Sequence, residues 1–241
     1  MNMQLQLGQS STPPRVKLTV AQFWFLKQSG AFPQYEKTEL IEGEMSGVPR
    51  GKDGEPESDA SIPIKLRVKD YLLLAEAGLL IDNGKTQLID GILYEMSPQH
   101  RPHWYAKNEM TYRLRRALEA MSSTLYVGSE GSVMLSEVDL LEPDIIVTGE
   151  PMGTGPIPLA SVRLLVEIAD STRILDFGIK AQRYAAAGVP EYWVLDISRA
   201  IIRQLWEPRQ KDYSRNRDVG FGSSAQAATI LGLHVDVPSA F

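Results

Sequence analysis

Residues 143–147 read PDIIV, and residues 162–168 read VRLLVEI. Both runs are made of aliphatic and β-branched residues, which is typical of strands that are buried on both faces. Each run holds one acid, Asp144 in the first and Glu167 in the second. If the runs form neighbouring strands, both carboxylates meet at one end of a sheet. Hard divalent cations take oxygen ligands and often use one or two carboxylates, so the pattern indicates a candidate metal site.

The sequence on either side of these runs predicts alternating helices and strands. Met110, Leu114 and Leu118 fall on one stripe at helical spacing, which predicts a long helix over residues 103–121. Gly188 and Pro190 end a second helix over residues 174–187. Further strands are expected at residues 124–127, 132–135, 191–197, 201–206 and 231–237. This order predicts an α/β fold in which one central mixed β-sheet is flanked by helices.

The N-terminal third of the chain repeats itself at an offset of 48 residues. KLTVAQF at 17–23 is echoed by KLRVKDY at 65–71, and LIEG at 40–43 by LIDG at 88–91. Each copy predicts a short helix, at 21–28 or 69–77, and then a hairpin closed by Glu42-Gly43 or Asp90-Gly91. Beyond the turn, EMS at 44–46 matches EMS at 95–97, which suggests three extra residues in the second copy.

The duplicated helix-hairpin element also bears on domain organisation. Residues 47–63 are rich in Gly, Pro, Asp, Glu and Ser, which is typical of a linker. We therefore predict two parts, a degenerate first copy with its linker over residues 1–60 and the main domain over residues 61–241. We expect the hairpins to add strands at the edge of an assembly, across the two-fold axis of a homodimer.

Composition excludes several classes of protein. The 241 residues contain no Cys, which excludes disulfides and thiolate metal sites. No apolar run is long enough to cross a membrane, and the Gln-rich start does not resemble a signal peptide, so we expect a cytoplasmic protein without a membrane partner. The formal net charge of −5 argues against a protein that coats nucleic acid. A basic bias late in the chain suits phosphate contacts and ordinary solvated charges equally: Arg199, Arg203, Arg209, Lys211, Arg215 and Arg217.

Lys180 follows Glu167 by 13 residues, on the next predicted helix. Asp176, Lys180 and Tyr184 recur every four residues and so share one helix face. A lysine beside a metal could orient or deprotonate a water, or stabilise charge on a phosphoryl oxygen. Other roles fit the same residues: Asp144 next to Pro143 suits a turn, Glu167 suits a buried ion pair, and Lys180 suits a solvated lysine that bridges Asp176.

A set of motifs from about Lys65 onwards resembles a known family. These motifs are LIDG at 88–91, EMSP at 95–98, His103, Pro143-Asp144, EIADST at 167–172, Asp176, Lys180, Tyr184 and GVPEYWVLD at 188–196. Together they resemble the Uma-type putative restriction endonucleases of the PD-(D/E)XK nuclease superfamily. The resemblance implies a restriction-endonuclease-like fold and a metal-dependent endonuclease acting on DNA.

The resemblance also implies roles for single residues. Asp144 and Glu167 stand where the family has its two acids, which hold Mg²⁺ or Mn²⁺, and the backbone carbonyl of Ile168 is a further metal ligand. The superfamily's usual lysine, two residues after the second acid, is replaced by Ala169, and Lys180 takes its place. His103 matches a family histidine that would hold a phosphate or a metal-bound water.

Three functions remain open at this point. The first is hydrolysis of DNA phosphodiester bonds by Asp144, Glu167, Lys180 and His103 with a divalent cation. The second is a catalytically silent module that binds nucleic acid on the same fold. The third is an interaction protein that forms oligomers through the repeated element.

Overall fold

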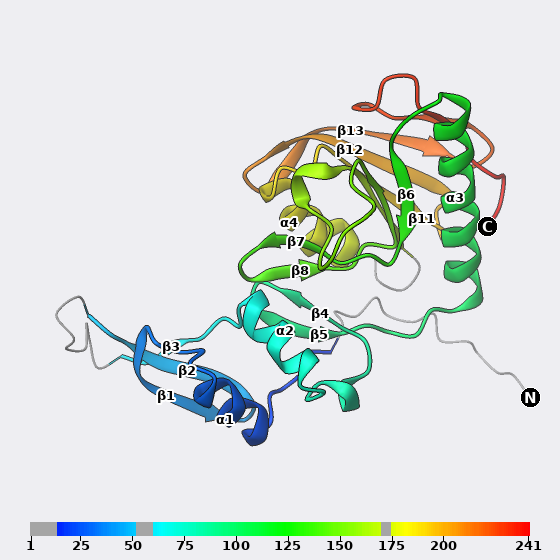
Figure 1. The fold of residues 1–241 in the computed structure, drawn as a ribbon. Coiled ribbons are helices and arrows are strands. Elements are labelled where there is room, and N and C mark those ends of the chain that lie inside the picture. The colour runs from blue at the N-terminus through cyan, green and yellow to red at the C-terminus, as the bar shows by residue number, and fades with distance from the viewer. Residues whose placement is uncertain (1–13, 52–59, 170–174) are drawn as a thin grey trace, which may run out of the picture. The chain divides into compact units, whose positions relative to one another are not determined.

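The computed structural model of the chain describes residues 14–51, 60–169 and 175–241 (Figure 1). They divide into two compact units. The first, here called the sheet unit, contains Pro98–Leu135 and Glu142–Phe241. The second, called the repeat unit, contains Pro14–Ser97 and Ser136–Leu141. No helix in the described parts of the chain is long and apolar enough to span a membrane.

The sheet unit is built on six strands in the order β13-β12-β11-β10-β9-β6. Strands β10 and β11 run parallel, and every other neighbouring pair is antiparallel. The strands are β6 (Tyr126–Ser129), β9 (Ile145–Thr148), β10 (Val162–Ala169), β11 (Glu191–Asp196), β12 (Ile201–Arg209) and β13 (Asp212–Gly220). The mixed α/β fold with a central sheet that the sequence predicts is confirmed. β13 was not predicted, because its residues are mostly exposed and charged and carry no apolar alternation.

Helix α3 (Arg101–Ala120) covers one face of this sheet (Figure 1). It begins two residues before the predicted start and has Pro102 in its first turn, where a missing N–H costs nothing. Met110, Leu114 and Leu118 are buried against Val166 and the rest of that sheet face. Each such side chain contributes about 1.5–3 kcal/mol by leaving water, so the stripe fixes the helix on the sheet.

The other face of the sheet carries α4 (Ala181–Ala186). Side chains alternate along a strand, so Glu167 of β10 points away from the face that Val166 and Ile168 share with α3. The chain crosses from β10 to β11 on that side, through a π-helical segment at Leu175–Lys180 that continues directly into α4. The helix predicted over residues 174–187 is present from Leu175, and residue 174 lies outside the described residues.

Shorter elements complete the sheet unit. A 3-10 turn, η2 (Leu159–Ser161), leads into β10. Near the C-terminus, β14 (Ser224–Gln226) pairs with β15 (His234–Asp236), and β15 lies against α3. The strand predicted over residues 231–237 is therefore shorter than expected, and its partner is a local strand.

The repeat unit contains two similar successions of elements, with α1 beside β1–β3 and α2 beside β4 and β5 in Figure 1. The first succession is α1 (Val20–Gln28), β1 (Tyr35–Ile41), β2 (Glu44–Pro49) and β3 (Ile62–Pro63). The second is α2 (Val68–Glu76), the 3-10 turn η1 (Ile81–Asn83), β4 (Thr86–Ile89) and β5 (Ile92–Glu95). β8 (Asp139–Leu141) pairs with β4, and the chain reaches it through β7 (Val133–Ser136).

Both hairpins turn in the same way. Glu42 and Gly43 have φ of 51° and 80°, and Asp90 and Gly91 have φ of 54° and 72°. Two successive positive φ values are the mark of a two-residue turn that matches the twist of a hairpin. Both predicted turns are therefore present, and each glycine supplies the conformation that its position requires.

The turn also corrects one detail of the predicted repeat. Ile41 pairs with Glu44 in one hairpin, and Ile89 pairs with Ile92 in the other. The offset of 48 therefore continues past the turn, and the three extra residues inferred from the EMS letters are not there. A two-residue turn fixes the register of the two strands, whereas the shared tripeptide EMS does not.

The segment predicted as a linker, residues 47–63, is partly strand. Residues 47–49 belong to β2 and residues 62–63 form β3, while residues 52–59 lie outside the described residues. The boundary predicted near residue 60 falls inside the repeat unit, because Leu26 of α1 and Leu74 of α2 are buried in one core.

Candidate active site

The sheet brings Asp144 and Glu167 together. Val166 of β10 pairs with Ile145 of β9 in an antiparallel register, so the next residues along, Glu167 and Asp144, face each other across the two strands. The backbone N–H of Ile168 donates to Asp144 Oδ2 at 2.8 Å, which fixes the position of this carboxylate at the strand end. The neighbouring strands and adjacent acids that the sequence predicts are thus both found.

Glu167 is buried, with 2% of its surface exposed. Its Oε1 accepts a hydrogen bond from the Tyr184 hydroxyl at 2.7 Å and lies 2.9 Å from Lys180 Nζ. Burial raises the pKa of Glu167 to about 8, and the charges of Asp144 and Asp176 also raise it, against the opposing effect of Lys180. In the absence of a cation, burial therefore disfavours the charged form of Glu167.

Lys180 is buried as well and is not the solvated lysine that one interpretation of the sequence allowed. Its Nζ lies 3.4 Å from Asp176 Oδ1 in addition to the contact with Glu167. Burial on its own would lower the pKa of Lys180, but the charges of Glu167, Asp176 and Asp144 outweigh burial and raise it above its ordinary value. Lys180 is therefore a fixed ammonium group, which donates hydrogen bonds and does not accept protons near neutral pH.

His103 reaches the same carboxylate from α3. Its Nε2 lies 3.2 Å from Asp144 Oδ2, and both side chains are largely buried. Burial raises the pKa of Asp144, but the hydrogen bond and charge of His103, the charge of Lys180 and the Ile168 N–H outweigh it, and the pKa falls below its usual value. Among the residues that the structure describes, none forms a hydrogen bond with His103 Nδ1, which is buried.

The surroundings of the two acids thus shift their pKa values in opposite directions. The pKa of Asp144 is lowered, while that of Glu167 is raised to about 8. Such pairs are common at sites where acid and base chemistry takes place. Lys180 and His103 approach them from different elements, so all four predicted catalytic residues lie in one cluster.

Two buried tyrosines support this cluster. The Tyr184 hydroxyl donates to Glu167, and the Tyr192 hydroxyl donates to the backbone carbonyl of Asp176 at 3.0 Å. Burial and then the nearby charge of Glu167 raise both tyrosine pKa values well above the ordinary range. Both phenols therefore remain neutral donors. The rings pack on each other with centroids 4.9 Å apart, which holds α4 against β11.

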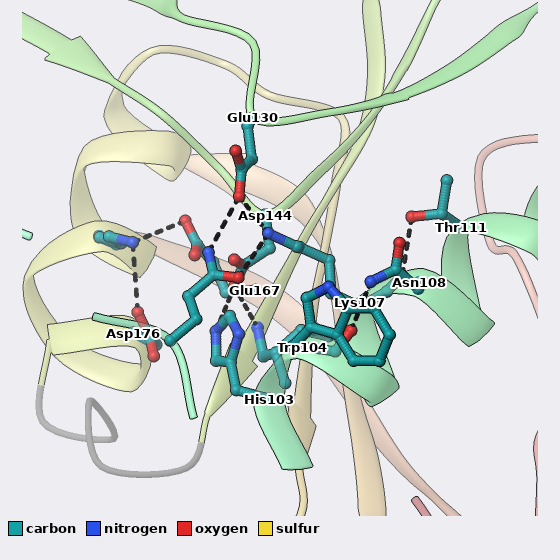
Figure 2. A network of polar contacts seen from close by, with 12 residues as sticks. His103, Trp104, Lys107, Asn108, Thr111, Glu130, Asp144, Glu167 and Asp176 are labelled. Atoms are coloured by element: carbon teal, nitrogen blue, oxygen red, sulfur yellow. Dashed lines mark hydrogen bonds and ion pairs between the residues drawn. The ribbon is translucent and has the colours of Figure 1, made fainter. Parts of the chain in front are cut away.

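A second polar group, missed at the sequence level, adjoins the first. Lys107 lies one helical turn after His103 on α3 and is 5% exposed. Its Nζ donates to Gln99 Oε1 at 2.6 Å and contacts Glu130 Oε1, and Gln99 Nε2 donates to the same Glu130 oxygen at 3.0 Å (Figure 2). The backbone N–H of Glu130 donates to the Asp144 carbonyl at 3.3 Å. In the sequence, the only indication of the group formed by Lys107, Gln99 and Glu130 was that Lys107 follows His103 by four residues and so shares its helix face.

Other residues considered from the sequence lie outside the cluster. His100 precedes α3 and His234 lies in β15, and both are exposed. Trp193 is fully buried, and its Nε1 donates to Glu191 Oε1 at 2.6 Å, so it packs in the core.

Three of the six basic residues noted late in the chain have partners in the β12–β13 hairpin. Arg203 bonds to Asp218, Arg215 to Glu207 and Arg217 to Gln204. For Arg203 and Arg215, ion pairs within the hairpin account for the charge, whereas Arg217 bonds to a neutral amide.

Glu191 is a buried acid of a different kind. Its carboxylate accepts from the backbone N–H groups of Ala228 and Thr229 at 2.8–3.0 Å, from the Thr229 hydroxyl at 2.9 Å and from Trp193. These donors satisfy the carboxylate completely and anchor the turn after β14. Glu191 is thus structural, although it belongs to the same motif that suggested the family.

The donor chemistry of the cluster fits a divalent cation. Among the described residues, no three His, Asp or Glu side chains converge on one point as a closed metal site. Two carboxylates, however, suffice for Mg²⁺ when waters fill the remaining positions. The Ile168 N–H faces Asp144, and the N–H and C=O of one strand residue point to the same side. Its carbonyl is therefore directed toward the two acids, whereas that of Ala169 bonds to Ile197 on the β11 side.

Comparison with known proteins identifies the family. The Uma2 family model, described as a putative restriction endonuclease, matches residues 68–238. A solved structure from Anabaena variabilis ATCC 29413, a putative nuclease belonging to DUF820, has the same fold with a TM-score of 0.52 and 13% sequence identity, covering 70% of this chain and 91% of that chain. Among curated proteins there is no match. Since the family model spans well over half of the residues, the chain belongs to the Uma2 family of putative restriction endonucleases.

Proposed function

We propose that the chain is a metal-dependent nuclease that hydrolyses phosphodiester bonds of DNA. The observation that carries the proposal is the pairing of Asp144 and Glu167 on adjacent strands, with the buried Lys180 ammonium 2.9 Å from Glu167. Family membership and the fold shared with a protein described as a putative nuclease support it.

Asp144, Glu167 and the Ile168 carbonyl would hold the cation, for which Mg²⁺ or Mn²⁺ suits oxygen donors. The bound cation would polarise a phosphoryl oxygen and lower the pKa of a water. The protein's part is positioning. The hydrogen bond from Ile168 fixes Asp144, and the Tyr184 hydroxyl fixes Glu167.

Lys180 acts in this proposal as a donor and not as a base. Its pKa is raised, so the ammonium keeps its proton. A fixed cation in a buried site stabilises the negative charge that develops on the phosphoryl oxygens. The proposal thus selects one of the two lysine roles that the sequence left open.

His103 orients a water in this scheme. Its Nε2 faces Asp144 Oδ2, and its buried Nδ1 has no hydrogen-bond partner among the described residues, so the water would bind at Nδ1. Lys107 is buried and paired with the exposed Glu130 carboxylate near the same strand end, so its part in this scheme is to hold Glu130 in place.

A catalytically silent module that binds nucleic acid is the second candidate. The observation that favours it is the ion pairing of Lys180 with both Glu167 and Asp176, because a lysine that neutralises the acids can also replace a metal. The absence of the superfamily lysine at Ala169 points the same way. This candidate predicts that DNA binding persists without a divalent cation.

Cleavage of a supercoiled plasmid and a single-stranded oligonucleotide, with Mg²⁺, Mn²⁺ or EDTA, tests the proposal. We expect cleavage by the native chain with a divalent cation and none by Asp144→Asn, which keeps the size of the side chain and its hydrogen bond from Ile168. Circular dichroism checks that the variant folds. Equal cleavage by both proteins would reject the site. DNA binding without cleavage in any cation would support the silent module.

A further inference from the structure

The two copies in the repeat unit make equivalent contacts in addition to having similar sequences. Leu18 N–H donates to the Gly43 carbonyl at 3.0 Å, and Leu66 N–H donates to the Gly91 carbonyl at 3.1 Å. In each copy, the segment that leads into the helix therefore crosses directly over the turn glycine of its own hairpin.

The fit at these glycines is equally close in both copies. A Cβ on Gly43 would lie 2.5 Å from the Cβ of Lys17, and a Cβ on Gly91 would lie 2.5 Å from the Cβ of Lys65. Glycine is therefore required twice for the same reason, in addition to its positive φ.

The lead-in segments also exchange partners between the copies. Arg15, before the first helix, bridges Tyr94 in the second hairpin, and Pro63, before the second helix, pairs with Ser46 in the first hairpin. Val16 N–H donates to the Leu93 carbonyl at 2.8 Å. At the equivalent position, Ile64 N–H donates to the Met45 carbonyl at 2.9 Å.

The two sets of contacts use equivalent residues, because Arg15, Val16, Met45 and Ser46 each lie 48 positions before Pro63, Ile64, Leu93 and Tyr94. The lead-in segment of the first copy therefore adds to the hairpin of the second copy, and the lead-in segment of the second copy adds to the hairpin of the first in the same way. Reciprocal contacts of this kind are the property of an interface with two-fold symmetry.

The two helices show the same reciprocity with different side chains. Gln22 Nε2 at the start of α1 donates to the Leu79 carbonyl of the second copy at 2.6 Å. Arg67 at the start of α2, held by Asp70, donates to the Ala31 carbonyl of the first copy. Ala31 and Leu79 are equivalent positions. Because different side chains, Gln22 and Arg67, bind equivalent backbone carbonyls, the symmetry lies in how the two copies pack and not only in their sequence similarity.

The buried core joins the two copies. Leu26 of α1 and Leu74 of α2 are both fully buried in one cluster, together with Met45 and Leu93 of the two hairpins. The lead-in segments and turns of both copies also line a cavity of about 300 Å³. If the first copy were absent, Leu74 and the edge of β5 would lose their cover. An uncovered edge strand with apolar neighbours is a site for pairing with another chain.

We infer that the repeat unit is a fused dimer of two helix-hairpin copies. The copy over residues 65–97 has a surface that would bind another helix-hairpin element, and the N-terminal copy of the same chain occupies that surface. The family model matches residues 68–238 and so does not include the first copy. The first copy of the same chain therefore already covers this surface. A homodimer that uses this surface would require the same strands to pair between two chains, and that exchange is the competing arrangement.

Engineered disulfides distinguish the two arrangements, because the natural chain has no Cys. The hydrogen bonds on both sides of Arg15 and Tyr94, from Val16 to Leu93 and from Glu95 to Pro14, mark a non-hydrogen-bonded antiparallel pair. In such a pair the Cα atoms lie about 4.5 Å apart, within the range that a disulfide spans. Ser46 and Pro63 form the equivalent pair, at a more exposed place.

The experiment uses the full chain with Arg15→Cys/Tyr94→Cys or Ser46→Cys/Pro63→Cys. A mixture of ¹⁵N-labelled and unlabelled protein is oxidised and analysed by non-reducing electrophoresis and peptide mass spectrometry. We expect monomers in which the two cysteines of one chain are joined, with no cross-linked peptide that combines the isotopes. Glu39→Cys/Ser46→Cys, which joins partners within the first hairpin, is the control for oxidation.

Covalent dimers with mixed isotopes would overturn the inference and establish exchange between chains. Failure of both test pairs to close within the chain, under conditions where the control pair closes, would overturn it as well. Because Ser46 and Pro63 are less buried than Tyr94, the second pair retains the test if Tyr94→Cys disturbs folding.

Discussion

Glu167 and Lys180 form an ion pair of 2.9 Å in which both side chains are almost completely buried. A buried pair of this kind offers little net stability, since the loss of hydration offsets most of the attraction. Three carboxylates, those of Asp144, Glu167 and Asp176, act on the one ammonium. The cluster therefore has more acid than it needs for pairing, which is the arrangement expected where a cation binds.

The first prediction concerns the stability of the metal-free protein against pH. The folded-state pKa of Glu167 is about 8, above its usual 4.5, so between these values the folded state binds more protons than the unfolded state. Stability must then fall as pH rises from about 5 to about 8 and level off beyond. Lys180 stays charged in both states over this range and adds no slope.

Thermal denaturation in EDTA at a series of pH values measures this slope. Glu167→Gln removes the titrating group and should flatten the curve between pH 5 and 8, while Glu150→Gln, at an exposed position, should leave it unchanged. A curve for Glu167→Gln that still falls in parallel with that of the native protein would assign the slope to another group.

The second prediction concerns Lys180. Lys180→Met keeps the length of the side chain but removes the charge, so Glu167 and Asp176 lose the cation between them. If Lys180 stabilises charge in the transition state, the cleavage rate should fall by about 10²-fold or more, with a smaller change in DNA affinity. The exposed Lys211 provides the control, because Lys211→Met should leave the rate unchanged. Equal losses in rate and affinity would indicate that Lys180 only binds DNA.

The sequence predicted much of this arrangement, and the reason lies in the strands. The runs at 143–147 and 162–168 are so uniformly apolar that their acids stand out, and an acid inside a buried strand demands a partner. Lys107 could not be found in this way. On an amphipathic helix, a lysine is ordinarily solvated, and only the fold shows that Glu130 and Gln99 surround it. The exchange of lead-in strands in the repeat unit was equally hidden, because pairing between distant segments leaves no local pattern.

The third prediction compares the buried hydroxyls of Tyr184 and Tyr213, which have different partners. Tyr184 donates to the Glu167 carboxylate, whereas Tyr213 donates to the Val189 backbone carbonyl at 3.1 Å. Replacing either by Phe removes one buried hydrogen bond and should cost about 1–2 kcal/mol of stability. Only Tyr184→Phe should weaken Mn²⁺ binding, measured by calorimetry, since only Tyr184 holds a proposed ligand. Equal metal affinities in the two variants would remove Tyr184 from the site.

The fourth prediction concerns the two turn glycines of the repeat unit. A side chain at Gly43 or Gly91 meets a lysine Cβ at the same 2.5 Å and faces the same positive φ. Gly43→Ala and Gly91→Ala should therefore destabilise the protein by similar amounts, about 1–3 kcal/mol each, as seen by urea denaturation. Gly220→Ala, where a Cβ meets nothing within 4 Å and φ is not in the left-handed region, is the reference for an open glycine. A large effect at one turn alone would show that the two hairpins are not equivalent.

The fifth prediction contrasts two buried acids of the sheet unit, Glu191 and Glu167. Glu191 accepts from four donors that are all part of the fold, so its charge is completely satisfied. Glu191→Ala should leave the N–H groups of Ala228 and Thr229 and the indole of Trp193 without an acceptor. Each unpaired buried group costs about 1–3 kcal/mol, so this variant should lose several kcal/mol of stability.

The opposite outcome is expected at Glu167. Its raised pKa shows that the fold does not satisfy the charged form, so Glu167→Gln should leave the stability of the metal-free protein at pH 8 unchanged or increased. Metal binding should be lost in Glu167→Gln and retained in the folded fraction of Glu191→Ala. Denaturant titration with and without Mn²⁺ measures both quantities in one experiment. If the cation instead stabilises Glu167→Gln as strongly as the native chain, Glu167 is not a ligand, and the charge at this strand serves only to pair with Lys180.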